Sequence, residues 1–220
     1  MKAAVQAAAV RFNPLATILV TASDTGVGKT RVAGWVARAL SATGRTQVIK
    51  PVEAGAPSGP PQDAPTAAGD WAEAHTLISL PLPLAPLATG QGSVTLSDCL
   101  KRLEALPKVQ HRVIEGAGGV AVPIDVSGAD WVDFAQAVAP DLIVIVIEDR
   151  LGAINQARLT HHYIRSRLPK VRLGIWLNAA QAVPEAAVAR ANRLGISAAG
   201  LTLIGESGYN AAQPVRMDLL

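Results

Sequence analysis

A run of small and polar residues at positions 23–30 carries specific chemistry. It reads Ser-Asp-Thr-Gly-Val-Gly-Lys-Thr and follows an apolar stretch. Where a buried strand turns into a helix, consecutive backbone N–H groups and the helix dipole can hold a phosphate chain. Gly28 allows close approach of the backbone, Lys29 can reach the β- and γ-phosphate oxygens, and the Thr30 hydroxyl can bind Mg²⁺. The alternative is a plain strand-to-helix turn, because Ser23 replaces the first glycine of GxxxxGK[ST].

Two later stretches place a cation and a carboxylate directly after apolar segments. Lys50 begins Lys-Pro-Val-Glu-Ala-Gly, and Glu115 begins Glu-Gly-Ala-Gly-Gly. The carboxyl ends of parallel strands meet at one edge of a sheet, where ligands bind in open α/β folds. There Lys50 could stabilise developing negative charge, and Mg²⁺ on the phosphates would compensate the buried charge of Glu115. The alternatives are a surface lysine and an ordinary glutamate at a strand end.

A third candidate is the start of an expected helix at residues 152–155, which read Gly-Ala-Ile-Asn. The exposed amides of a helix start attract an anion such as a substrate carboxylate. Simple helix capping is the alternative. The four histidines are too dispersed for a metal set, and the single cysteine, Cys99, can form neither an internal disulfide nor a multi-thiolate site.

The elements that must position these residues alternate between short apolar runs and stretches of helical period. This pattern predicts one α/β domain over residues 1–220, with an open, mainly parallel sheet and helices on both faces. Strands are expected at residues 18–21, 47–50, 112–115, 142–147, 172–177 and 201–204. Helices are expected at residues 29–41, 70–80, 96–106, 131–138, 152–168 and 185–194.

Local signals refine this outline. Four prolines and three glycines at residues 55–69 predict an irregular, mobile loop. A second proline cluster, which comprises Pro81, Pro83 and Pro86, predicts another irregular connection. Thr95, with Asp98 three residues later, is typical of a capping box at the start of a helix.

Composition excludes several classes of protein. Of the 220 residues, 50% are hydrophobic and 17% charged, which excludes disorder and predicts a large core, and the 4% of aromatic residues makes that core aliphatic. The net charge is +3, but Lys and Arg are scattered, so we expect neither nucleic acid nor membrane binding. No apolar run reaches the roughly 20 residues of a membrane span. We expect a cytoplasmic protein.

Together these motifs resemble the dethiobiotin synthetase family, ATP-dependent carboxylases with a phosphate-loop NTPase fold. The resemblance covers residues 18–206. The family's TDTGVGKT, KPVxSG, EGAGG and GxxN correspond to residues 23–30, 50–55, 115–119 and 152–155. The chain departs from the family at Ala22, Ala54, Gln156, residues 80–90 and residues 204–208.

The resemblance implies an ATP- and Mg²⁺-dependent cyclo-ligase of biotin biosynthesis. In this family CO₂ or bicarbonate carboxylates the diamine 7,8-diaminononanoate to a carbamate. ATP then phosphorylates the carbamate to a mixed anhydride, and the second amine closes the cyclic urea of dethiobiotin with loss of phosphate. The family also implies a homodimer with the site near the interface. The true acceptor and the nucleotide preference stay open at this point.

The resemblance also implies roles for individual residues. Those that bind the nucleotide are Ser23, Asp24, Thr25, Gly26, Val27, Gly28, Lys29, Thr30, Asn178 (by reading adenine) and Gly205. Those in catalysis are Thr25, Lys29 and Lys50, and those that bind the metal are Thr30, Glu115 and Asp70. Asp70 is chosen because it opens an expected helix after the KPV loop, and Asp63 is the competing choice. Those that bind substrate are Lys50, Gly116, Ala117, Gly118, and, from the partner subunit, Gly152, Ala153, Ile154 and Asn155.

Two other functions remain possible from the residues alone. Chromosome-partitioning ATPases are nucleotide switches with this general fold, acting on a protein or DNA partner. They usually carry an extra lysine early in the phosphate loop, where this chain has Ala22 and Ser23. An amide-forming synthetase is the other alternative, although the chain is short for the glutaminase domain that such enzymes often carry.

Overall fold

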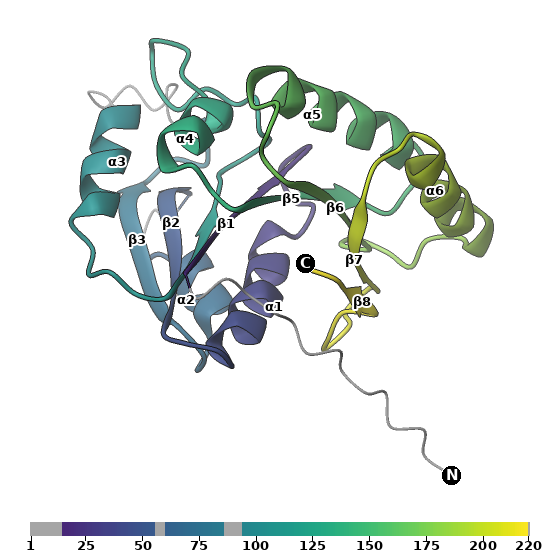
Figure 1. Ribbon diagram of the computed structural model, residues 1–220, viewed down its shortest axis with the longest axis horizontal. Helices are drawn as coiled ribbons and strands as arrows, with labels where there is room; N and C mark the ends of the chain where they lie inside the picture. Colours follow the sequence, from purple (N-terminus) through teal and green to yellow (C-terminus); the bar gives the residue numbers. More distant parts are fainter. Residues whose placement is uncertain (1–14, 56–59, 86–93, 220) are drawn as a thin grey trace.

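The computed structural model describes residues 15–55, 60–85 and 94–219, and within them it confirms the expected α/β fold (Figure 1). The strands form one sheet in the order β3-β2-β4-β1-β5-β6-β7-β8, parallel except for β8. The strands are β1 (Ala16–Ala22), β2 (Thr46–Ala54), β3 (Glu73–Leu80), β4 (His111–Glu115), β5 (Leu142–Glu148), β6 (Leu173–Asn178), β7 (Leu203–Ser207) and β8 (Arg216–Met217). The helices are α1 (Lys29–Ser41), α2 (Asp63–Ala68), α3 (Leu96–Glu104), α4 (Trp131–Val138), α5 (Ala153–Arg167) and α6 (Ala186–Ala198).

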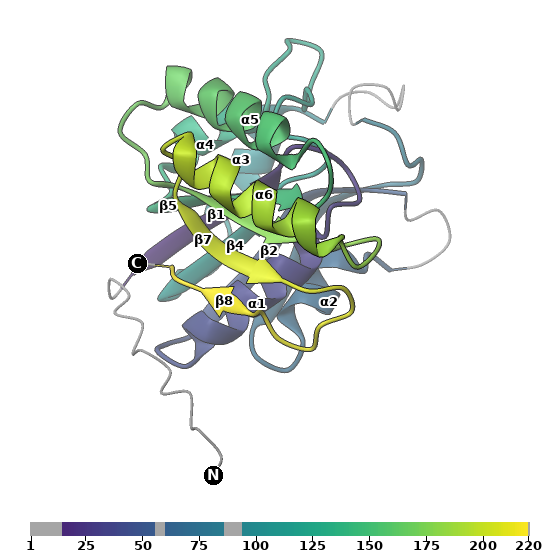
Figure 2. The ribbon, with the colours of Figure 1, turned by 90° about the vertical axis from the view of Figure 1, so that its right-hand side faces the viewer.

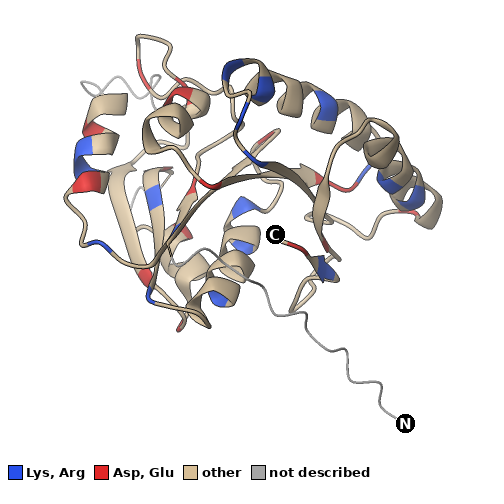
Figure 3. Ribbon diagram, in the orientation of Figure 1, with Lys and Arg blue, Asp and Glu red and all other residues tan. Residues whose placement is uncertain are grey.

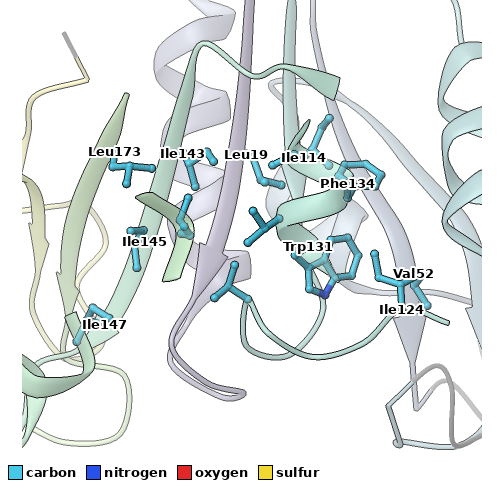
Figure 4. Close-up of a cluster of buried hydrophobic side chains, with 14 of the residues drawn as sticks. Leu19, Val52, Ile114, Ile124, Trp131, Phe134, Ile143, Ile145, Ile147 and Leu173 are labelled. Atoms are coloured by element: carbon cyan, nitrogen blue, oxygen red, sulfur yellow. The ribbon is translucent and has the colours of Figure 1, made fainter. Parts of the chain in front are cut away.

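Helices cover both faces of the sheet, as Figure 2 shows for α5 and α6 on one side and α1 and α2 on the other. Trp131 and Phe134 of α4 pack with Leu19 and Ile114 in the core beneath α3 to α6 (Figure 4). Because both faces are covered, the central strand β5 is a continuous run of buried residues with no polar alternation. The apolar composition of the chain is therefore explained by two cores, one on each side of the sheet.

Sheet register brings the chemical candidates to one edge. In the pairing of β2 with β4, Ile49 lies opposite Ile114, so Lys50 follows at the level of Glu115. In the pairing of β1 with β4, Val20 lies opposite Glu115. The residues that leave β1, β2 and β4 at their carboxyl ends are therefore neighbours, as the parallel arrangement predicts.

The expected helix at residues 70–80 is wrong. This segment forms the edge strand β3, which pairs with β2 from Gln47↔Glu73 to Ala54↔Leu80. Its apolar residues fit a helical period, but main-chain pairing with β2 and the β-branched Thr76 and Ile78 favour a strand. Propensity is a weak guide when a neighbouring strand supplies hydrogen-bond partners.

The loop expected at residues 55–69 contains the short helix α2, although positions 56–59 lie outside the described residues. The carboxylate of Glu53 accepts hydrogen bonds from the N–H groups of Gln62 (2.6 Å) and Asp63 (3.3 Å), so a side chain from β2 satisfies amides at the start of this helix. Pro65 is tolerated because it stands in the first turn. The prolines therefore limit the length of this helix without excluding it.

Other local expectations are confirmed. Helices α1 and α4 begin and end at the expected residues. The Thr95 hydroxyl oxygen accepts the N–H of Asp98 at 3.0 Å, as the capping pattern predicts. The two-residue strand β8 was not expected, because so short a segment carries no periodic signal. Part of the second proline cluster, Pro86, falls outside the described residues.

The placement of charged residues and the hydropathy of the helices can be compared with what the sequence predicts. Lys and Arg are spread over α1, α3, α5 and α6 and are not gathered on one element (Figure 3). None of the helices in the described part of the chain is long and apolar enough to cross a membrane.

Candidate active site

The turn between β1 and α1 has the geometry of a phosphate loop. Gly26 and Gly28 adopt φ of 77° and 90°, in the left-handed region that glycine enters without strain. A Cβ on Gly28 would also lie 2.1 Å from Nδ2 of Asn178. Position 28 therefore requires glycine for its conformation and for the close approach of Asn178.

Lys29 is buried at the start of α1 and bonds within this loop. Its Nζ donates to the carbonyl oxygen of Asp24 at 2.8 Å. Burial, together with the nearby charge of Lys50, lowers the pKa of Lys29 to about 8. The lysine is thus a desolvated cation at the N-terminus of α1, the positive end of the helix dipole. This arrangement favours the binding of an anion.

Glu115 is the centre of a buried polar cluster. One carboxylate oxygen, Oε1, accepts from Lys50 Nζ at 2.6 Å and from the Thr30 hydroxyl at 2.9 Å. The other oxygen, Oε2, is buried with no hydrogen-bond partner among the described residues. Burial raises the pKa of Glu115, a cost that the lysine opposes. The cluster therefore presents one uncompensated carboxylate oxygen, which a cation would satisfy.

Lys50 bridges two carboxylates. Besides Glu115, its Nζ lies 2.7 Å from Asp63 Oδ2 and donates to the Gly116 carbonyl oxygen at 3.3 Å. Burial alone would lower the pKa of Lys50, but the charges of Glu115 and Asp63 outweigh it and raise the pKa. The ammonium therefore stays protonated and fixed in direction.

These groups share one cavity of about 510 Å³. It lies over the phosphate loop and is bounded by the ends of β2 and β4 and by the segment after β3. Its lining includes Thr25, Gly26, Gly28, Lys29, Thr30, Lys50, Asp63, Glu115, Ala117 and Gly118. The structure thus brings together three motifs whose lining residues, from Thr25 to Gly118, lie up to 93 positions apart in the sequence.

Asp63, and not Asp70, is the aspartate at this cavity. Asp63 is the first residue of α2, whereas Asp70 is exposed in the turn that follows it. The reason for preferring Asp70 fails with the helix expected at residues 70–80. No local pattern predicts the contact of Glu53, whose carboxylate accepts a hydrogen bond from the amide N–H of Asp63. The signal for Asp63 was a helix start: an aspartate two residues before a proline.

The donor set fits Mg²⁺. Within the described ranges no three His, Cys, Asp or Glu side chains are grouped as a metal site. Two carboxylates, Glu115 and Asp63, and the Thr30 hydroxyl do lie around Lys50 and the cavity. Mg²⁺ commonly uses one or two carboxylates and keeps water or phosphate oxygens as its other ligands. The unpartnered Oε2 of Glu115 is the atom that most needs such an ion.

The loop after β4 packs against the phosphate loop. A Cβ on Gly119 would lie 2.9 Å from the carbonyl oxygen of Ser23, so the two loops approach at backbone distance. Gly118 adopts φ of 67°. Ala117 and Gly118 line the cavity, whereas Gly116 is covered by Trp131.

The remaining expected site residues lie elsewhere. Gly152 caps α5 in the left-handed conformation, and Gly152, Ile154 and Asn155 line a separate groove between α5 and α6. Ala153 is buried. Gly205, expected to bind the nucleotide, lies within β7, where a Cβ would meet the indole of Trp176 at 2.2 Å, and it is not among the residues that line the cavity.

Asn178 ends β6 and is fully buried. Its Nδ2 donates to the carbonyl oxygen of Val27 in the phosphate loop at 2.8 Å, and its Oδ1 accepts from the Ser207 hydroxyl at 2.6 Å. Ser207 could not be predicted as part of this cluster, because nothing in its local sequence distinguishes it from other serines at strand ends.

The chain is similar in sequence to known proteins. A family model described as an AAA domain matches residues 16–206. The ATP-dependent dethiobiotin synthetase of Nitrosospira multiformis is 35% identical over 187 residues, which cover 80% of each chain. That of Xanthomonas oryzae is 38% identical over 157 residues, 64% of this chain and 68% of the relative.

Solved structures agree on the fold. A ParA family ATPase of Chlorobium tepidum superposes with a TM-score of 0.51 at 13% identity, covering 90% of this chain and 85% of its own. Apo McdA of Cyanthece gives a TM-score of 0.52 at 18% identity, covering 87% and 85%. At these identities the likeness is one of architecture alone.

The buried ion pair between Lys50 and Glu115 should contribute to the free energy of unfolding. Lys50→Met leaves the Glu115 charge buried without its cation, so we expect unfolding free energy to fall by about 3 to 5 kcal/mol. The double variant K50M/E115Q removes both charges and should be more stable than K50M alone. Urea unfolding measures both. A K50M variant within about 1 kcal/mol of wild type would contradict the pairing.

Proposed function

This chain belongs to the ATP-dependent dethiobiotin synthetase family of carbon–nitrogen ligases, and we propose that its cavity binds Mg²⁺ and ATP beside a diamine. The family catalyses an ATP-driven ligation in biotin biosynthesis. The observation that carries it is the convergence of Lys29, Lys50 and Glu115 on one cavity.

Each group has a physical task in this proposal. The amides of residues 23–30, with Lys29, bind the triphosphate. Lys50 stabilises the negative charge on the carbamate and on the phosphoryl group during transfer, because it is a fixed, desolvated cation. Thr30, Glu115 and Asp63 would hold Mg²⁺, which when bound screens the phosphate charge. Ala117 and Gly118 border the same space and provide the substrate side.

The reaction we propose joins three components in balanced steps. One amine of 7,8-diaminononanoate adds to CO₂ and loses a proton, giving a carbamate. The carbamate oxygen takes the γ-phosphoryl group of ATP, releasing ADP. The second amine then attacks the carbonyl carbon and loses a proton, phosphate leaves with the former carbamate oxygen, and the five-membered urea closes. Thr25, which lines the cavity, would contact the phosphoryl oxygens.

We propose a cytoplasmic homodimer that completes this site. Gly152, Ile154 and Asn155 line a groove distinct from the cavity. Leu151 and Leu159 beside them are 80% and 63% exposed, which is high for leucine. A second copy covering this surface would bury them and could bring the α5 start, with its amides, to the carboxylate end of the substrate.

Dependence on the diamine tests the function. Phosphate release from ATP should require 7,8-diaminononanoate and bicarbonate together, and dethiobiotin should appear in equal amount by mass spectrometry. GTP in place of ATP measures nucleotide preference. Phosphate release that is independent of the diamine but increases with DNA or a protein partner would favour a partitioning ATPase instead.

Two aspartates separate the metal proposals. Asp63→Asn should raise the Mg²⁺ concentration for half-maximal turnover by about tenfold to a hundredfold, because it removes a charged ligand. Asp70→Asn, a matched change in the exposed turn, should leave that concentration unchanged. Mn²⁺ binding by electron paramagnetic resonance gives the same comparison without turnover. A loss in D70N alone would reverse the assignment.

The assembly has a direct measurement. Sedimentation velocity should give a mass twice the 22.8 kDa of one chain. Leu151→Asp, in the exposed apolar surface, should shift the protein toward monomer and lower turnover, because a charge in a dimer interface must be desolvated. A fully active monomer would remove the partner subunit from the site.

A further inference from the structure

A buried asparagine on α6 holds the turn that precedes α5. The two helices lie side by side (Figure 2), and a Cβ on Gly195 of α6 would lie 2.3 Å from Cδ1 of Ile154 in α5. Asn192 of α6 is buried, and its Nδ2 donates to Oδ1 of Asp149 at 2.7 Å and to the carbonyl oxygen of Arg150 at 3.1 Å. Both acceptors lie between the end of β5 and the start of α5. Asn192 therefore connects α6 to the segment that leads into α5.

The orientation of the Asn192 amide follows from its partners. A carboxylate oxygen and a backbone carbonyl oxygen only accept hydrogen bonds, so the amide nitrogen must face both. Asp149 is itself held in place: its N–H donates to the carbonyl oxygen of Asn178 at 2.9 Å, and its Oδ2 lies 3.9 Å from Nη1 of Arg193. Asn192 is thus fixed against a carboxylate that has its own supports.

The carbonyl oxygen of Arg150 has a second donor. The N–H of Ala153, the first residue of α5, donates to it at 3.1 Å. A backbone carbonyl oxygen has two lone pairs, and Asn192 and Ala153 use both. In a regular α-helix this carbonyl would accept the N–H of Ile154, four residues later. Within the described part of the chain, the N–H groups of Ile154 and Asn155 have no hydrogen-bond acceptor. Both amides are therefore available to an external anion.

Removal of Asn192 would change the hydrogen bonding at this turn. The Arg150 carbonyl would have a free lone pair in a buried setting, where an unsatisfied acceptor is unfavourable. The donor that a regular helix supplies to it is the Ile154 N–H. Helix α5 would then gain an internal hydrogen bond, and the Ile154 amide would no longer be available to a ligand.

We propose that Asn192 is a positioning residue for the carboxylate end of the substrate. By occupying the Arg150 carbonyl, it keeps the Ile154 N–H free to donate to that carboxylate. The inference rests on the proposed function, in which the start of α5 in one subunit binds the carboxylate of a diamine held by the other. Asn192 acts through the turn and not by contact with the substrate, because its amide N–H groups are already engaged.

Two diamines that differ only in the carboxylate test this proposal. They are 7,8-diaminononanoate and 2,3-diaminononane, in which a methyl group replaces the carboxylate. Asn192→Leu removes both hydrogen bonds of the side chain without adding a charge. It should raise the KM for 7,8-diaminononanoate about tenfold, the effect of one lost hydrogen bond to a charged group, and leave kcat unchanged. The KM for 2,3-diaminononane should not change, whereas a merely structural role would affect both diamines alike.

An exchange of the two side chains provides a second variant if N192L does not fold. D149N/N192D restores a hydrogen bond between positions 149 and 192, now donated from position 149. The carboxylate at position 192 has no proton to donate to the Arg150 carbonyl. This variant should therefore be more stable than N192L in urea and show the same selective rise in KM.

A matched control on the same helix separates positioning from stability. The guanidinium of Arg193 pairs with the carboxylates of Glu206 and Asp149. Arg193→Met removes these ion pairs and leaves the hydrogen bond from Asn192 to Arg150 in place. It should lower the melting temperature and leave the KM for both diamines unchanged.

Several results would overturn the inference. An unchanged KM for 7,8-diaminononanoate in N192L or in the exchange variant would show that Asn192 does not prepare the carboxylate site, as would an equal rise for both diamines. The same selective rise in R193M would trace the effect to stability. A wild-type enzyme with one KM for both diamines would overturn the carboxylate site at α5, and this inference with it, while the requirement for a diamine would still stand.

Discussion

One buried carboxylate organises the centre of this molecule. Glu115 ends a strand that is covered on both faces, and a charge there is unfavourable unless other groups compensate it. Lys50 from the neighbouring strand and Thr30 from the first helix both bond the same oxygen. The strand order β2-β4-β1 is what makes this possible, because it sets the glutamate between the two elements. The groups proposed to act on ATP are therefore also those that allow this sheet edge to be charged.

The short helix α2 extends this arrangement to a segment that is otherwise poor in regular structure. Its first residue, Asp63, contacts Lys50, and its first amides are bound by Glu53 from the end of β2. Strand β2 thus contributes both the cation and the carboxylate that fixes the cation's second partner. Lys50 and Glu53 are three positions apart in the chain, so one strand end determines the charge balance on that side of the cavity.

Features that depend on neighbours in sequence were predictable, and those that depend on neighbours in space were not. The phosphate loop, the bounds of α1 and the Thr95 cap follow from residues within one or two turns. The fate of residues 70–80 depended on β2, which no local pattern reveals. Choosing between Asp63 and Asp70 required knowing that α2 forms. Ser207 lies beside Asn178 only because β6 and β7 pair. Family resemblance identifies Asn178 as a site residue, but its hydrogen bond to the phosphate loop depends on the folded structure.

The bond from Lys29 to the Asp24 carbonyl has a consequence for how the loop meets its ligand. The Lys29 ammonium already donates to the Asp24 carbonyl oxygen. A polyanion that binds Lys29 must therefore replace this internal hydrogen bond. Binding then exchanges a neutral acceptor oxygen for an anionic one. The net free energy from this contact is the difference between the two hydrogen bonds. The internal bond therefore favours ligands that carry more negative charge than the neutral carbonyl oxygen of Asp24.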